Sequence, residues 1–408
     1  MTRVVAPRRA WIVSKPARDP RVFGLTGRER LARSLSRLGI PVAPAPGEAA
    51  AGLPGAGDSL LFRADWVYDD RLVAALCETE ATLLVSRTGH AVAAHVPDTA
   101  RDEALRLLRH PLDAGLDGGS DEFAGERAAG SDEAAWRCVG PDDLVPPYTH
   151  ELRKRAPALL EPLTGASPHE LERRLFDASY KGITDLVTKF LWPPLALPAV
   201  RACARLGISP NALTTGSWLL AVWVCACFAT GRFGPGLAAA WLMTFLDTVD
   251  GKLARVTLRS SRIGHVLDHG LDILHPPFWW AAWGLALPSA PWVTAATWVT
   301  VVGYWVHRAV EGIFLALFGI EIHAWRAVDA RFRLITTRRN PNLILLTAGF
   351  LAGRPDAGFL AVAAWTVASI AFHGVRIAQA GLEALRGRPI HSEYEEGPPP
   401  PAEPQAAA

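Results

Sequence analysis

The sequence of 408 residues predicts a two-part protein, with an N-terminal α/β domain and an all-α C-terminal domain of six transmembrane helices. Three observations predict this fold class. Hydrophobic residues make up 50% of the chain, a share that disfavours a wholly soluble protein. Long apolar stretches recur between Asn211 and Ala380, with lengths that suit bilayer spans. Before Pro210, short apolar runs of strand type alternate instead with segments of helical spacing.

The N-terminal part has the alternation of a small α/β domain. Short apolar runs with strand character lie at residues 10–13, 59–62 and 82–85, and helical spacing occurs between them at residues 28–38 and 71–77. The start of the chain lacks the apolar core of a secretory signal, so we expect this soluble domain to stay in the cytoplasm. We place the soluble domain at residues 1–145.

A long loop is expected at residues 114–142, which are rich in Gly, Asp, Glu and Ser. Residues 146–208 are then a linker with juxtamembrane helices, because residues 151–163 and 169–186 are amphipathic and charged. Residues 189–206 combine large apolar and basic side chains, which favours a helix lying on the membrane surface. A soluble connecting helix is the alternative for that segment.

The C-terminal domain, at residues 209–382, divides into six apolar segments. Their approximate bounds are 211–230, 235–256, 264–286, 291–320, 340–353 and 357–380. The loops after the second and fourth segments are rich in Arg, so both termini and these loops are expected to face the cytoplasm. Residues 383–408 carry much Pro, Glu and Ala towards their end and are expected to be a disordered tail.

Charge and cysteine content exclude some functions. The net charge of +2 gives no indication of a nucleic-acid partner. The five cysteines show no metal-type pairing, and their odd number argues against a disulfide framework. We therefore expect a reducing, cytoplasmic environment for the soluble domain.

Four carboxylates within 26 residues are the main chemical signal of the sequence: Asp247, Asp250, Asp268 and Asp272. The first two are three residues apart and the last two are four apart, so each pair projects from one face of a helix. The Arg-rich turn between the pairs makes the two helices antiparallel neighbours. We therefore expect all four carboxylates in one place.

Carboxylates near a bilayer are costly unless they face a polar cavity, a partner or a metal. Mg²⁺ or Mn²⁺ resolves this cost, because both ions prefer hard oxygen ligands and can bridge them to a phosphate. Arg255 can offer two parallel donors to a phosphate, and Gly251 and Gly264 allow close approach of a helix or nucleotide. A helix-end residue in a cytosolic loop is the alternative for any single aspartate.

The full spacing D-x2-D-G-x2-A-R-x8-G-x3-D-x3-D resembles the signature of the CDP-alcohol phosphatidyltransferase family, and every defined position is met. The resemblance covers residues 179–380. It implies a six-helix membrane fold, often dimeric, with a cavity facing the cytosol and two divalent ions. Asp247, Asp250 and Asp268 match the family's metal ligands, while Asp272 matches its proposed general base and also touches metal. Positions that match contacts to the CDP group are Pro210, Asn211, Thr214, Gly251, Arg255 and Ser261.

The implied reaction transfers a substituted phosphoryl group from a CDP-linked donor to an acceptor hydroxyl and releases CMP. Two metal ions can clamp the diphosphate, and a carboxylate can take the proton of the hydroxyl. An acceptor with its own phosphate needs a second cationic site, for which Arg308, Arg338 and Arg339 are candidates. Ordinary positive residues of a cytosolic loop are the alternative for Arg338 and Arg339. Arg308 and His307 interrupt an apolar run, where Glu311 one turn later can pair with either.

The N-terminal domain resembles a sugar-nucleotide-type nucleotidyltransferase that has lost part of its site. Asp65, after a strand, matches a metal-binding aspartate of that family. The first strand is not followed by the glycine-rich loop that wraps a phosphate, so we expect a degenerate, inactive domain. The two-domain layout resembles the bifunctional inositol-phosphate cytidylyltransferase and di-inositol phosphate synthase.

The sequence leaves several functions open. The donor is CDP-diacylglycerol or a CDP-polyol, in phospholipid or polar headgroup synthesis, and CDP-inositol in a di-inositol-phosphate-synthase-like reaction is the alternative. A metal-ion or solute transporter is the alternative from another class, because membrane carboxylates also mark ion pathways. A membrane scaffold without activity is a third.

Overall fold

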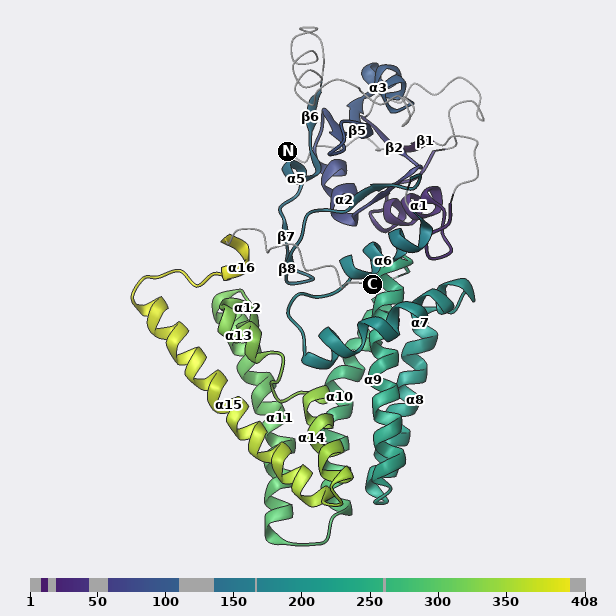
Figure 1. The fold of residues 1–408 in the computed structure, drawn as a ribbon. Helices are drawn as coiled ribbons and strands as arrows, with labels where there is room; N and C mark the ends of the chain where they lie inside the picture. The colour runs from purple at the N-terminus through teal and green to yellow at the C-terminus, as the bar shows by residue number, and fades with distance from the viewer. Residues whose placement is uncertain are drawn as a thin grey trace. The chain divides into compact units, whose positions relative to one another are not determined.

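The computed structural model of the chain describes residues 9–13, 20–43, 58–109, 136–165, 167–259 and 262–396 (Figure 1). The side chains of residues 262, 263, 265–269, 271 and 396 lie outside this description. The chain divides into two compact units. The first comprises residues 1–147 and 156–178, and the second comprises residues 148–155 and 179–408.

A five-stranded mixed sheet forms the centre of the first unit. In spatial order its strands are β1 (Arg9–Val13), β2 (Asp58–Arg63), β5 (Ala91–Pro97), β4 (Thr82–Val85) and β6 (Arg137–Val139). β1 pairs parallel with β2, and β4 pairs parallel with β6, while β5 runs antiparallel to both of its neighbours. The three strands predicted from the sequence are confirmed, and the fold of this unit is α/β.

Helices cover both faces of this sheet. Successive residues of a strand point to opposite faces, so Phe62 and Leu61 of β2 enter two different cores. Phe62 packs with Leu35 and Leu72, whereas Leu61 packs with Leu105. These leucines belong, in that order, to α1 (Gly27–Arg37), α2 (Asp70–Glu78) and α3 (Arg101–Leu108). The smaller elements are β3 (Trp66–Tyr68), η1 (Asp98–Ala100), α5 (Pro141–Leu144), β9 (Leu160–Pro162) and α6 (Pro168–Ala178).

The boundary region differs from the sequence-based expectation. β6 and the start of α5 lie within the predicted loop at residues 114–142, while residues 114–135 lie outside the described residues. β9 pairs antiparallel with β3, which places residues 156–178 in the first unit rather than in a linker. Residues 151–163 form strands rather than an amphipathic helix, because their backbone groups pair with β3 and with β7 (Tyr148–Thr149).

The second unit is helical, apart from the hairpin of β7 and β8 (Lys154–Arg155). Its long helices are α7 (Pro193–Arg205), α8 (Pro210–Ala229), α9 (Phe233–Val256), α10 (Arg262–Ala286), α11 (Pro291–Phe318), α14 (Arg339–Leu351) and α15 (Pro355–Leu385). The last six coincide with the six predicted segments. Among the described residues, α8, α11 and α15 are long and apolar enough to cross a membrane. The count of six spans stays a prediction.

Tryptophan side chains build the core of the helical unit. α8 packs against α9 and α10, and α15 packs against α11 and α14 (Figure 1). Trp279 and Trp283 of α10 are fully buried against Phe228 of α8, and Phe359 of α15 joins the same core. The indole Nε1 of Trp279 donates to the carbonyl of Ala221 at 2.9 Å, so the buried polar atom is satisfied.

The short elements of the helical unit are η2 (Val187–Leu191), α12 (Ile322–Trp325), α13 (Ala327–Phe332) and α16 (Glu393–Glu396). The predicted disordered tail is wrong for residues 383–396. Glu383 pairs with Arg326 at 2.7 Å, and Ser392 is buried and donates to the carbonyl of Ala324 at 2.6 Å. Residues 397–408 lie outside the described residues.

Candidate active site

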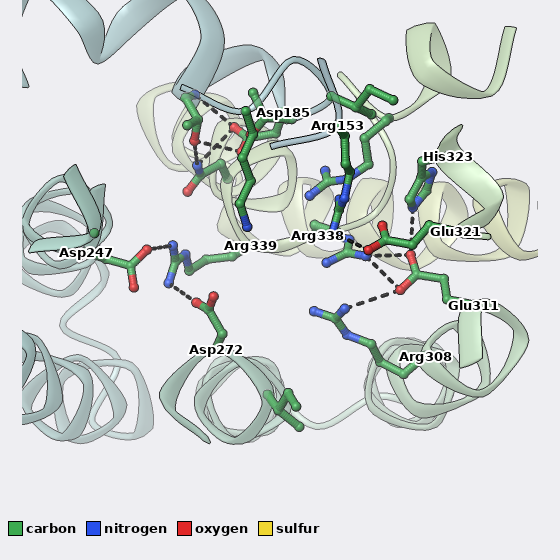
Figure 2. A pocket seen from close by; sticks show the side chains of 18 of the residues that line it. Arg153, Asp185, Asp247, Asp272, Arg308, Glu311, Glu321, His323, Arg338 and Arg339 are labelled. Carbon is green, nitrogen blue, oxygen red and sulfur yellow. Dashed lines mark hydrogen bonds and ion pairs between the residues drawn. The ribbon is translucent and has the colours of Figure 1, made fainter. Parts of the chain in front are cut away.

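A polar cavity of about 520 Å³ lies within the helical unit, among α9, α10, α11, α14 and the segment of residues 181–188. Its lining carries eight Lys or Arg side chains and five Asp or Glu side chains. The excess of cationic groups suits a ligand with several negative charges. Two clusters of charged side chains organise the cavity, and both include a residue at the start of α14 (Figure 2).

The first cluster consists of Asp247, Arg339 and Asp272, and we call it the aspartate cluster (Figure 2). The guanidinium of Arg339 lies between the two carboxylates. Its Nη2 donates to Oδ2 of Asp247 at 2.6 Å, and its Nη1 donates to Oδ1 of Asp272 at 2.9 Å. Asp247 comes from α9 and Asp272 from α10, so one cation joins the two helices that carry the predicted signature.

Two prolines explain how α10 is held at Asp272. Pro276 and Pro277 lie inside the helix and have no backbone N–H, so the carbonyls of residues 272 and 273 lose their intrahelical donors. The hydroxyl of Tyr304, on α11, lies 2.8 Å from the carbonyl oxygen of Ile273 and 3.3 Å from that of Asp272. It replaces the missing donor. The contact fixes α10 against α11 where the acidic side chain enters the cavity.

The second cluster consists of Glu311, Arg308, Arg338 and His323, and we call it the glutamate cluster (Figure 2). Arg338 donates to both carboxylate oxygens of Glu311, at 2.6 and 2.7 Å, and Arg308 donates to one at 3.2 Å. Nε2 of His323 lies 2.9 Å from the other oxygen. Burial lowers the pKa of His323 well below its usual range, against the opposing effect of Glu311. The imidazole is therefore neutral and donates.

Extended backbone separates Arg338 and Arg339, although they are adjacent. Arg338 has φ −143° and ψ 176°, and consecutive side chains point in opposite directions in such a conformation. One guanidinium therefore reaches the glutamate cluster and the other reaches the aspartate cluster. Because Arg338 is the N-cap of α14, the orientation of both side chains depends on how this helix begins.

Polar contacts fix the start of α14. Asn340 donates to Oδ1 of Asp185 at 3.0 Å, and the backbone N–H of Thr337 donates to Oγ of Ser369 at 3.1 Å. Burial raises the pKa of Asp185, but the charge of Arg333 and the hydrogen bonds from Asn340 and Thr188 outweigh it. The pKa of Asp185 is therefore lowered. An ionised carboxylate therefore holds the segment that carries Arg338 and Arg339.

The segment before η2 adds a lysine to the cavity lining. Lys252 of α9 anchors this segment, since its Nζ donates to the carbonyl of Ser179 at 3.1 Å and lies 3.3 Å from the centre of the Tyr180 ring. Lys181 lines the cavity two residues after Ser179. Burial lowers its pKa, and the nearby charges of Arg255 and Arg153 lower it further.

The structure brings most of the predicted charged residues together. Asp247, Gly251, Arg255, Asp272 and the three predicted acceptor-side arginines all line the cavity. The remaining described positions do not line it: Pro210, Asn211, Thr214 and Asp250.

Asp250 is buried behind the cavity lining. Its Oδ2 accepts a hydrogen bond of 2.7 Å from the hydroxyl of Thr214 on α8, so the two predicted positions contact each other. Arg255 contacts the carbonyl of Gly251 at 3.4 Å and lies 4.0 Å from Glu151. Ser261 and the side chain of Asp268 lie outside the described residues.

The carboxylates of the aspartate cluster fit a divalent cation. Hard carboxylate oxygens suit Mg²⁺ or Mn²⁺, and Asp247 and Asp272 already converge on one cation, the guanidinium of Arg339. In the described part of the chain, no group of three or more acidic, His or Cys side chains has metal-site geometry. The side chain of Asp268 lies outside these described residues.

Sequence reasoning missed several residues of the cavity: Arg153, Lys181, Asp185, Tyr304, Glu321 and His323. Arg153 and Glu321 form an ion pair although they lie far apart in the chain. The paired prolines in α10 were the available signal for Tyr304, because they predict carbonyls that need a donor. The predicted pairing of Arg308 with Glu311 is confirmed.

Comparison with known proteins identifies one segment. Residues 207–332 match the CDP-alcohol phosphatidyltransferase family. The phosphatidylinositol phosphate synthase of Mycolicibacterium smegmatis is 30% identical over 133 residues, which cover 30% of this chain and 60% of that protein. A protein of Rubrobacter xylanophilus named bifunctional IPC transferase and DIPP synthase is 32% identical over 165 residues, covering 38% of this chain and 34% of that protein.

A solved structure is also similar. The phosphatidylinositol phosphate synthase of Mycobacterium tuberculosis, solved with CDP-DAG bound, has a TM-score of 0.36 and 19% identity, covering 45% of this chain and 94% of that one. The sequence matches span less than two thirds of the named relatives. The resemblance to this family, predicted from the aspartate spacing over residues 179–380, is confirmed for residues 207–332.

Proposed function

We propose that this chain, whose residues 207–332 form a CDP-alcohol phosphatidyltransferase domain, is an integral-membrane transferase for substituted phosphate groups. It moves such a group from a CDP-linked donor to an acceptor hydroxyl and releases CMP. One observation carries the proposal: Asp247 and Asp272, from two helices of the signature, converge in one polar cavity with Gly251 and Arg255.

The aspartate cluster is the metal side of the cavity in this proposal. Asp247 and Asp272 would hold Mg²⁺ or Mn²⁺ together with Asp250 and Asp268, the two other signature aspartates. Two such ions, when bound, neutralise the charge of a diphosphate and of the leaving CMP. Asp272 sits on the cavity wall, where its carboxylate accepts the proton of the attacking hydroxyl.

The CDP group is assigned to the end of α9. Arg255 lines the cavity and offers the planar donor pair that suits a phosphate, while Gly251 leaves room beside it. Pro210, Asn211, Thr214 and Ser261 complete the assignment by their match to the family signature. The hydroxyl of Thr214 supports Asp250, so its contribution acts through that aspartate.

The glutamate cluster is the acceptor side. Arg308 and Arg338 share a single carboxylate, so their combined charge exceeds that of Glu311. A cationic excess in a polar cavity favours an anionic group, and bidentate guanidinium contacts suit phosphate. We therefore propose an acceptor that carries its own phosphate, with Arg339 as a third arginine near the reacting hydroxyl.

We propose that α8, α9, α10, α11, α14 and α15 all span the membrane. Of these, α9 carries charged residues of the cavity, which lower its apolar content, and α14 has only 13 residues. The Arg-rich loops support a cytoplasmic side of the cytoplasmic membrane for the cavity and, in this proposal, for the first unit. A homodimer is the proposed assembly.

The first unit is proposed to be a degenerate nucleotidyltransferase-like domain. Asp65 follows β2, as that family requires, but it forms an ion pair of 2.6 Å with Arg63, the last residue of β2. The carboxylate is thereby neutralised by its neighbour. The CDP-linked donor would then be made by another protein.

The test is release of CMP by the purified protein in detergent with Mg²⁺ or Mn²⁺. Donors would include CDP-diacylglycerol and CDP-inositol, each with phosphorylated and unphosphorylated polyol acceptors. We expect acceptor-dependent release that is lost in Asp272→Asn. No release from any pair, with divalent ions carried across liposomes instead, would refute the transferase and favour a transporter.

A further inference from the structure

Arg339 occupies the place where a metal ion would meet the aspartates. Its two terminal nitrogens contact one oxygen each of Asp247 and Asp272, and its side chain is only 14% exposed. A cation cannot enter between these oxygens without displacing the guanidinium. The same two carboxylates therefore have two competing cationic partners, one of which is part of the chain.

The surroundings of Arg339 allow the side chain to leave without moving its backbone. Asn340 is tied to Asp185, and Thr337 is tied to Ser369, so the backbone on both sides of Arg339 is fixed. The side chain itself is long and flexible and borders a cavity of about 520 Å³. The guanidinium can therefore move into the cavity by a change of side-chain rotamer while the backbone stays in place.

Electrostatics explains why the two cations exclude each other. The guanidinium offsets one of the two negative charges, and its charge-assisted hydrogen bonds stabilise the aspartates when no metal is bound. A divalent ion on the same oxygens would lie within a few ångströms of the guanidinium, and like charges at that distance repel strongly in a partly buried site. Metal binding must therefore break both contacts of Arg339.

We propose that Arg339 is an exchangeable counter-ion, which holds Asp247 and Asp272 in the metal-free protein and gives way when a divalent cation binds. The proposal rests on the metal site of the proposed function. Displacement of Arg339 places a free guanidinium in the cavity, where it can contact an anionic group of a substrate. Cation loading thereby prepares the neighbouring anion site.

The experiment is a Mn²⁺ titration of the purified full chain in detergent, with free Mn²⁺ measured by electron paramagnetic resonance. Wild type is compared with Arg339→Gln and with the matched control Arg308→Gln, whose contact is to Glu311 rather than to an aspartate. We expect Arg339→Gln to lower the Kd for Mn²⁺ about tenfold, the equivalent of one charge-assisted hydrogen bond. Arg308→Gln should lower the Kd by a smaller factor than Arg339→Gln does, because Arg308 contacts Glu311 and acts on Asp272 only through its charge.

A second variant distinguishes loss of the guanidinium contacts from loss of the fold. Arg339→Lys keeps the charge but has a single ammonium that cannot span both carboxylates, so its Kd for Mn²⁺ should fall between those of wild type and Arg339→Gln. In parallel, Mn²⁺ should raise the unfolding temperature of Arg339→Gln more than that of wild type.

Unchanged or weaker Mn²⁺ binding by both Arg339 variants would overturn the proposal, since Arg339 would then only position the aspartates. Absence of Mn²⁺ binding by wild type and variants alike would overturn it as well. Neither result depends on CMP release. A protein with the predicted Mn²⁺ affinities and no transferase activity would contradict the proposed function but would still support the proposal of counter-ion exchange.

Discussion

The two charged clusters of the cavity use the same residue types in opposite proportions. In the aspartate cluster, two carboxylates share the guanidinium of Arg339. In the glutamate cluster, the guanidiniums of Arg308 and Arg338 share the carboxylate of Glu311. The three side chains of the first cluster carry a formal charge of −1, and those of the second carry +1.

The opposite net charges of the two clusters explain how one cavity can bind both a cation and an anion. A net negative cluster favours a cation, and a net positive cluster favours an anion such as phosphate. Two adjacent residues, Arg338 and Arg339, contribute one arginine to each cluster, because the extended backbone at Arg338 points neighbouring side chains in opposite directions. The start of α14 therefore separates the two kinds of binding site. The predictions below test that division.

The largest effect is expected from the aspartate cluster. Asp272→Asn removes a cation ligand and the proposed proton acceptor, so CMP release should fall at least about 10³-fold. The measurement is the initial rate of CMP release at saturating Mn²⁺. Asp356→Asn is the matched control, because Asp356 forms an ion pair with Arg354 outside the cavity lining and should leave the rate unchanged. Equal rates in wild type and Asp272→Asn would remove this residue from the reaction.

The glutamate cluster should respond in stability. Glu311→Gln leaves the guanidiniums of Arg308 and Arg338 without their shared carboxylate. Breaking a largely buried ion pair from one side should lower the free energy of unfolding by about 3 kcal/mol. Thermal unfolding in detergent measures this change. Glu383→Gln, which affects the more exposed pair with Arg326, should lose less than about 1 kcal/mol. Similar losses in both variants would show that the glutamate cluster contributes no more to stability than an exposed ion pair does.

Arg338→Gln should separate acceptor binding from the chemical step. It removes the bidentate partner of the glutamate cluster, so the KM for a phosphorylated acceptor should rise about 30-fold while kcat changes little. An unphosphorylated acceptor should show no such rise. A fall in kcat without a change in KM would place Arg338 on the metal side instead.

Tyr304→Phe tests the support of Asp272. The variant leaves the carbonyls of residues 272 and 273 without the hydroxyl donor, which should cost about 1 kcal/mol and lower kcat about tenfold through misplacement of Asp272. Steady-state kinetics measure kcat. Tyr394→Phe, away from the cavity lining, is the control. A kcat equal to that of wild type would show that the carbonyls of residues 272 and 273 need no donor from Tyr304 to keep Asp272 in place.

The smallest effect is expected at Asp185, which fixes the start of α14 and so supports both clusters. The lowered pKa of Asp185 means that its ionised form stabilises the fold. This contribution is complete above the unfolded pKa of about 4 and is lost as the pH falls through the folded pKa. Asp185→Asn should therefore be less stable than wild type by about 1 kcal/mol at pH 7, and the difference should vanish in acid. Urea unfolding at several pH values measures it, and a difference that does not decrease as the pH falls would contradict the assignment.

Local patterns predicted the elements well. Apolar runs gave the strands β1, β2 and β4, and apolar length gave the six long helices of the second unit. The assignment of residues 151–163 failed, because β8 pairs with β7 in a short hairpin and β9 pairs with the distant strand β3, and the periodicity of these residues carries no sign of either pairing. The disordered tail failed at residues 383–396 for the same reason, since its contacts are with α12 and its neighbours.

The sequence by itself determined that acidic residues spaced on two neighbouring helices would meet, because helical periodicity puts Asp247 and Asp272 on facing sides. Only the tertiary structure decided which cation they share, because Arg339 comes from a helix more than sixty residues away. It also decided that Arg338 and Arg339 divide between two clusters. That division depends on a backbone conformation and on long-range contacts through Asn340 and Thr337, which no local pattern encodes.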